Sequence, residues 1–102
     1  MKRDKEFTKV IFKKKYDQEA KEWYIVAFFP EATVNRGNIM SYVHDGQHGE
    51  ASYDYYLACK PASKDEYRHL KRELEQCYGY RFRLVHKVTR KDQEYAWRFG
   101  LH

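Results

Sequence analysis

The chain has 102 residues, of which 20 are Lys or Arg and 15 are Asp or Glu, for a formal net charge of +5. This length supports one domain with a single small core, and aromatic residues, 18% of the chain, must supply much of the buried area. No apolar run approaches the roughly 20 residues of a membrane-spanning helix, so we expect a cytoplasmic protein that does not enter a membrane.

The first segments with strand character lie before position 30. Residues 7–12 are rich in β-branched and aromatic side chains, and we expect this strand to end at the solvated lysines 13–15. After a polar turn, residues 23–29 form an apolar run of strand length. A strand without a polar face is covered on both sides, so we predict that it is central and that Pro30 ends it.

A hairpin is predicted next. Residues 39–44 form the third expected strand, and Asp45-Gly46 is a strong signal for a two-residue type I′ turn. The fourth strand would then return over residues 47–59, with a bulge near Gly49. Its register is set by the length of the turn.

Reactive side chains are concentrated around that turn. The expected register pairs Val43 with His48, which places His44 and His48 on opposite faces of the hairpin, so they could share a metal ion only in an irregular loop. His48 and Glu50 would share a face, where an imidazole–carboxylate pair suits general base catalysis. We predict no metal and no cofactor, and keep His48, Glu50 and His44 as a catalytic alternative to a polar hairpin tip.

One helix is predicted, between Ser63 and Gly79. Ser63 and Glu66 have the spacing of a capping box, and Gly79 suits the left-handed residue after a helix. The apolar face is expected to carry Tyr67, Leu70, Leu74, Cys77 and Tyr78. Cys59 and Cys77 are predicted to be reduced and largely buried, because two distant cysteines make neither a disulfide framework nor a zinc motif.

Alternation predicts a fifth strand over residues 80–89, with a basic outer face and with His86 on the apolar side as a core histidine. Residues 90–102 allow two interpretations, a last strand or an aromatic tail that docks on the core or on a partner. The expected fold is α+β: an antiparallel or mixed sheet of about five strands with one helix on one face, in the order ββββαβ. We expect residues 1–102 to form one domain, with flexible ends at 1–6 and about 90–102.

Three functions remain open. The first is a non-enzymatic protein-interaction or accessory module with a protein partner or a second copy of the chain, since the aromatic load exceeds what a small core hides. The second is a nucleic-acid-binding accessory protein whose basic strand face and its continuation carry Arg81, Arg83, Lys87, Arg90 and Lys91. The third is a hydrolase-like site in residues 44–50, although no motif in the sequence favours an enzyme.

The sequence also resembles a known group of proteins. The resemblance rests on Phe28-Phe29-Pro30-Glu31, Met40-Ser41-Tyr42, His44, Gly46-Gln47-His48-Gly49, Tyr53, Pro61-Ala62, Glu66-Tyr67 and Tyr78-Gly79-Tyr80. This pattern, over about residues 10–90, is similar to that of small uncharacterised bacterial proteins of plasmids and conjugative elements. The resemblance implies a bacterial accessory-gene setting and, because the group has no assigned activity, no functional residues.

Overall fold

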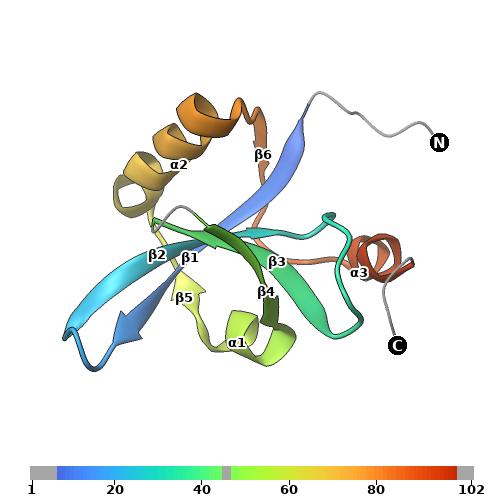
Figure 1. The fold of residues 1–102 in the computed structure, drawn as a ribbon, viewed down its shortest axis with the longest axis horizontal. Coiled ribbons are helices and arrows are strands. Elements are labelled where there is room, and N and C mark those ends of the chain that lie inside the picture. The colour runs from blue at the N-terminus through green and yellow to red at the C-terminus, as the bar shows by residue number, and fades with distance from the viewer. Residues whose placement is uncertain (1–6, 45–46, 99–102) are drawn as a thin grey trace.

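The structure of the chain, a computed structural model, describes residues 7–44 and 47–98. Most strands precede the helices in the chain (Figure 1). The elements follow in the order β1 (Thr8–Asp17), β2 (Glu22–Phe29), β3 (Asn38–Val43), β4 (Gln47–Ser52), α1 (Tyr53–Ala58), β5 (Lys60–Pro61), α2 (Lys64–Tyr78), β6 (Phe82–Leu84) and α3 (Arg90–Trp97). In the described part of the chain, no helix is long and apolar enough to cross a membrane.

Six described strands form one sheet in the order β4-β3-β2-β1-β5, with β6 also paired to β1. The pairs are antiparallel except that β6 runs parallel to β1. α2 and α1 lie on opposite faces of this sheet (Figure 1). The predicted α+β class is confirmed, including a helix on one face, although the described residues form three helices where one was expected.

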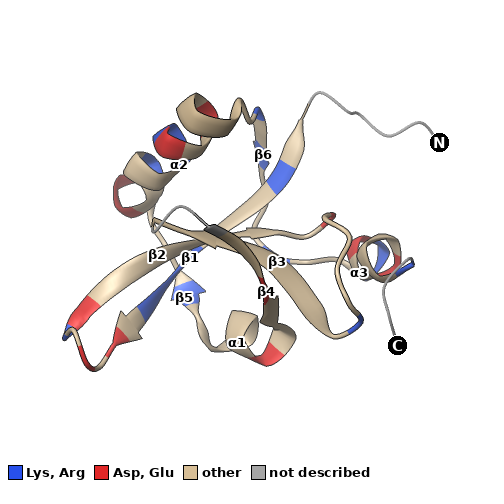
Figure 2. Ribbon diagram, viewed as in Figure 1, with Lys and Arg blue, Asp and Glu red and all other residues tan. Residues whose placement is uncertain are grey.

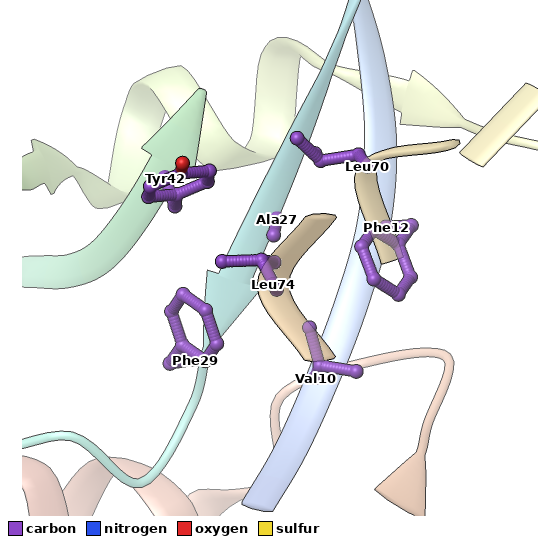
Figure 3. Packing of buried hydrophobic residues seen from close by; sticks show 7 residues of the cluster. All are labelled: Val10, Phe12, Ala27, Phe29, Tyr42, Leu70 and Leu74. Carbon is purple, nitrogen blue, oxygen red and sulfur yellow. The ribbon is translucent and has the colours of Figure 1, made fainter. Parts of the chain in front are cut away.

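β2 is central, as predicted, and both of its faces are buried. One core cluster lies under α2 and contains Val10, Phe12, Ala27, Phe29, Tyr42, Leu70 and Leu74 (Figure 3). The other lies on the α1 side and contains Ile11, Val26, Phe28, Ile39, Tyr56 and Cys59. Alternate residues of β2 therefore feed two separate layers, which is why its sequence has no polar face.

β1 is longer than predicted, because the lysines expected to end it continue the strand to Asp17. Lys13 pairs with Val26 and Lys15 with Tyr24 across the ladder to β2. The Lys13 ammonium lies 4.0 Å from the centre of the Tyr56 ring, so its aliphatic stem covers apolar surface while its charge faces an aromatic ring. Three adjacent lysines thus continue the strand instead of ending it.

The β3–β4 hairpin has a register one residue away from the predicted one. Val43 pairs with Gln47 and Tyr42 with His48, and the ladder runs unbroken to Asn38 and its partner Ser52, so the predicted pairing and the bulge near Gly49 are both wrong. The expected turn residues 45 and 46 lie outside the described residues. A one-residue shift moves every side chain of a strand to the other face, so His48 lies on the same side as Tyr42, toward α2.

The return strand ends at Ser52, not at residue 59, because Tyr53–Ala58 form α1. The Ser52 hydroxyl accepts a hydrogen bond from the Tyr55 amide and so caps this helix. Tyr56 then points into the core cluster under α1. Helical packing of a tyrosine-rich segment overrode its strand propensity.

α2 confirms the predicted helix and both of its ends. Ser63 and Glu66 form the full capping box, and Gly79 takes the left-handed conformation with φ of 72°. Tyr67 packs at the edge of the core cluster that Leu70 and Leu74 enter. The prediction for the cysteines is half wrong, since Cys59 is buried and Cys77 is exposed.

The predicted fifth strand is reduced to Phe82–Leu84. β6 pairs with residues 8–10 of β1, and β5 occupies the next part of the same edge at Lys13 and Lys14, so no partner remains for a longer strand. The chain bends at residues 86 and 87. His86 is exposed there, which contradicts its predicted place in the core.

The segment from residue 90 is a helix, so the described part of the predicted last strand is wrong. Thr89 and Asp92 form a capping box at the start of α3, and residues 1–6 and 99–102 lie outside the described chain. Trp97 donates its indole N–H to the Asn38 carbonyl at 2.9 Å, which ties α3 to the start of β3. The alternative interpretation, an aromatic segment docked on the core, describes the contacts of α3 better.

Candidate functional site

Two imidazoles meet three tyrosines and a carboxylate between the β3–β4 hairpin and the end of α2. We call this group the imidazole cluster; it consists of Tyr42, His44, His48, Glu73, Tyr78 and Tyr80. The hairpin supplies the first three residues, α2 the next two, and the connection after Gly79 the last.

A chain of hydrogen bonds fixes one of the imidazoles. The buried Tyr42 hydroxyl donates to Glu73 Oε2 at 2.5 Å, and Glu73 Oε1 lies 2.5 Å from His44 Nδ1. The Tyr42 hydrogen bond lowers the pKa of Glu73, although partial burial opposes it, and the contact with His44 adds to the lowering. Burial and the Glu73 contact raise the pKa of Tyr42, so its hydroxyl stays protonated and donates.

This arrangement leaves the outer nitrogen of His44 accessible. An ionised carboxylate accepts only, so His44 must present an N–H at Nδ1. In the neutral ring Nε2 then carries the lone pair, and the side chain is 90% exposed. His44 is therefore oriented at one nitrogen and open to solvent at the other.

His48 lies against aromatic rings beside the hydrogen-bonded residues Tyr42, Glu73 and His44. Its Nε2 is 3.0 Å from the Tyr80 hydroxyl, and its ring centre is 4.8 Å from that of Tyr42. Tyr78 meets the His48 ring edge-to-face at 5.0 Å and is itself 47% exposed. The pair of His48 and Tyr78 forms an exposed ring surface above the buried Tyr42.

The structure does not bring the predicted His48 and Glu50 together as a pair. Glu50 accepts hydrogen bonds from the Asn35 amide and from Asn38 Nδ2, and the Asn38 bond is the larger cause of its lowered pKa. The carboxylate that meets an imidazole is Glu73, on α2. No local pattern in the sequence marks Glu73, because the contact depends on how α2 crosses the hairpin.

The two imidazoles also differ from the prediction in direction. The expected register put them on opposite faces, whereas contacts with Glu73 and with Tyr78 turn both toward α2. Within residues 7–44 and 47–98, no group of three or more His, Cys, Asp or Glu side chains could hold a metal ion.

The predicted basic residues lie on one exposed stretch, which we call the basic segment, residues 81–91. It comprises β6, the bend after β6 and the start of α3. Figure 2 marks Lys and Arg on β6 and on α3. Its exposed cationic side chains are those of Arg81, Arg83, Lys87, Arg90 and Lys91. No Asp or Glu interrupts this stretch.

A hollow adjoins the end of the basic segment. Its volume is about 370 Å³, and three guanidinium groups with one carboxylate and one indole dominate its lining. The lining residues are Arg36, Arg90, Gln93, Glu94, Trp97 and Arg98. Arg90 also forms a loose ion pair with Glu94 at 3.8 Å on the surface of α3. This hollow was not predicted, because Arg36 comes from the loop before β3.

A separate aromatic pair lies at the far end of the β1–β2 hairpin. Tyr16 and Trp23 meet edge-to-face with their ring centres 5.4 Å apart, and they are 40% and 47% exposed. The ammonium groups of Lys14 and Lys60 lie 4.9 Å and 5.7 Å from the Trp23 ring. The expectation that some aromatic surface stays uncovered is met here.

No family model, curated protein or solved structure matches the chain. What the imidazole cluster, the basic segment and the aromatic pair do must therefore be argued from their own geometry.

Proposed function

We propose that the protein binds single-stranded nucleic acid through the basic segment. One observation carries this proposal: from Arg81 to Lys91 the chain exposes five Lys or Arg side chains and no Asp or Glu. Phosphate groups release counterions when such side chains neutralise them, and this release supplies most of the sequence-independent affinity. The net charge of +5 favours the same partner.

The shape of the segment favours a single strand over a duplex. β6 and the bend after it present an extended edge that can follow one phosphate backbone. α2, the longest described helix, mixes four acidic residues with its cations, which weakens its attraction for the phosphates of a duplex. The arginines of the hollow add a site for a phosphate or a stacked base next to α3.

The test compares two variants with the same loss of charge. R83Q/K87Q/K91Q removes three cations from the basic segment, and K64Q/R68Q/R72Q removes three exposed cations from α2. Binding of fluorescent single-stranded RNA and DNA is measured by anisotropy at several salt concentrations. The segment variant should bind more weakly, and its slope of log affinity against log salt should be smaller by about two, since each lost contact to a single strand removes about 0.7.

Two outcomes contradict this proposal. One is the absence of any binding by the wild-type protein at low salt. The other is an equal loss of affinity in both variants, which would mean that net charge alone attracts the nucleic acid. Preference for a duplex of the same length would redirect the proposal to double-stranded partners.

A second candidate function is self-association through the aromatic pair, and its specific support is the exposure of Tyr16 and Trp23. Large aromatic side chains are enriched at the centres of protein interfaces. If this candidate holds, sedimentation velocity should show a concentration-dependent dimer for the wild-type chain and a monomer for Y16S/W23S. A wild-type monomer at every concentration would contradict it.

A further inference from the structure

Nucleic-acid binding by the basic segment leaves the chemistry of the imidazole cluster unused. His44 is held at Nδ1 by a carboxylate and exposed at Nε2, while the buried Tyr42 hydroxyl holds that carboxylate from the other side. Orientation of an imidazole by a carboxylate at Nδ1 is how enzymes position a general base. A simple surface histidine would need neither of these two contacts.

The imidazole cluster is joined directly to the basic segment. Tyr80, the residue before Arg81, binds His48 through its hydroxyl and stacks on Phe82 of β6 at 5.1 Å. Arg81 and Arg83 alternate with Tyr80 and Phe82, which pack on the α2 side, so a nucleic acid that runs along the edge of β6 can meet both the cations and the cluster. The exposed rings of His48 and Tyr78 offer a surface on which an unpaired base can stack.

We propose that the imidazole cluster cleaves single-stranded RNA without a metal ion, with His44 as the general base. This inference rests on the proposed nucleic-acid binding and adds the class of substrate. A general base beside a bound phosphate backbone can act only if the substrate offers a hydroxyl group next to a phosphate. The ribose 2′-hydroxyl of RNA is such a group, and DNA lacks it.

The reaction is an internal displacement at phosphorus. His44 Nε2 accepts the proton of the 2′-hydroxyl as the 2′ oxygen forms a bond to the adjacent phosphorus. The bond from phosphorus to the 5′ oxygen of the next nucleotide breaks, and the leaving oxygen takes a proton from water. The hydroxide that remains takes the proton from the His44 imidazolium, which restores the base. The products are a 2′,3′-cyclic phosphate and a 5′-hydroxyl, and nothing is oxidised or reduced. Glu73 orients the base and balances the charge of the imidazolium that forms.

The main test follows end-labelled single-stranded RNA with the purified full chain in the presence of EDTA. The wild-type protein should yield fragments with cyclic phosphate ends, and the all-deoxy strand of the same sequence should stay intact. H44Q should lose cleavage by at least about 100-fold, the lower end of the contribution of a general base, while its affinity for RNA is unchanged. H69Q, which removes another exposed histidine from α2, should cleave like the wild type.

Glu73 is a positioning residue in this scheme and has its own readout. E73Q should lower kcat without raising KM, because the amide no longer holds His44 as the ionised carboxylate does. A merely structural role would instead lower stability and affinity together.

The outcomes separate this inference from the function on which it rests. RNA that stays intact while the wild-type protein binds it would overturn the cleavage and leave the binding. Cleavage that persists in H44Q would also overturn the role of His44. Loss of binding in R83Q/K87Q/K91Q with equal loss in K64Q/R68Q/R72Q would remove the binding proposal itself, whatever the result with H44Q.

Discussion

Asp92 is the one charged residue that is buried among the residues that the structure describes, with 2% of its surface exposed. Its carboxylate accepts a hydrogen bond from the Thr89 amide at 3.0 Å and another from the Lys9 ammonium at 2.9 Å. Burial acts to raise the pKa of Asp92, but the bonds from Thr89 and Lys9 together outweigh it and bring the pKa below its ordinary value of 3.8. The side chain thus joins β1 to the start of α3.

Replacement of Asp92 by Asn should destabilise the protein by about 1–3 kcal/mol, the usual cost of losing a hydrogen bond to a buried charge. In this variant Lys9 retains its ion pair with Glu31 at 3.7 Å, which limits the loss of stability. Urea unfolding at neutral pH measures the effect, and E94Q on the exposed side of α3 is the matched control, with a change of at most about 0.5 kcal/mol. Equal stability of the two variants would contradict this role for Asp92.

The same residue gives a dependence on pH with a definite sign. The pKa of Asp92 is lower in the folded than in the unfolded chain. Its contribution to stability is therefore fully present at a pH above the ordinary pKa, and it is lost as the pH falls through the pKa of the folded state. The difference in unfolding free energy between wild type and D92N should therefore shrink below about pH 4. A difference that grows on acidification would contradict the assigned direction.

At the scale of elements, two glycines differ in whether the backbone requires them. Gly79 ends α2 with a positive φ of 72°, which disfavours any side chain, whereas Gly49 lies in β4 with no positive φ and with no atom within 4 Å of an added Cβ. G79A should cost about 1 kcal/mol. G49A should be neutral or stabilise by about 0.4–1 kcal/mol, because it reduces the freedom of the unfolded chain. Thermal unfolding of both variants checks the contrast.

Helix ends show how far local sequence can be used. The capping box of Ser63 and Glu66 predicts the start of α2, and the structure confirms it. Thr89 and Asp92 have the same spacing and the same hydrogen bonds at α3, yet alternating aromatic residues after them suggested a strand. A cap is a local signal that is independent of tertiary contacts, so it was the more reliable of the two patterns.

At the scale of the whole molecule, stability depends on the contact of α2 with the sheet. Leu74 is fully buried between α2 and the side chains of β1, β2 and β3 (Figure 3). L74A should destabilise the protein by about 3 kcal/mol, in the range of buried leucine truncations. L57A on the exposed side of α1 is the control, with an expected change within about 0.5 kcal/mol. Similar unfolding free energies for both variants would contradict this account of the core.

The sequence by itself determined the features that neighbouring residues encode. These are the apolar run of β2 between two layers, the existence of the β3–β4 hairpin, the bounds of α2, and the exposure of the basic residues that follow Tyr80. Periodicity and capping act over a few residues, so they can be recognised without the fold. Alternation over residues 80–89 pointed to Arg81, Arg83 and Lys87, and Arg90 and Lys91 were added as the next basic residues of the chain.

Tertiary structure alone decided what depends on contacts between distant segments. The register of the hairpin differs by one residue from the local prediction, and this shift turns His48 toward α2. The carboxylate that holds His44 belongs to Glu73, and β6 stops at Leu84 because β5 takes the rest of the β1 edge. Edge pairing and helix crossing join residues that lie far apart in the sequence, so no single segment encodes them.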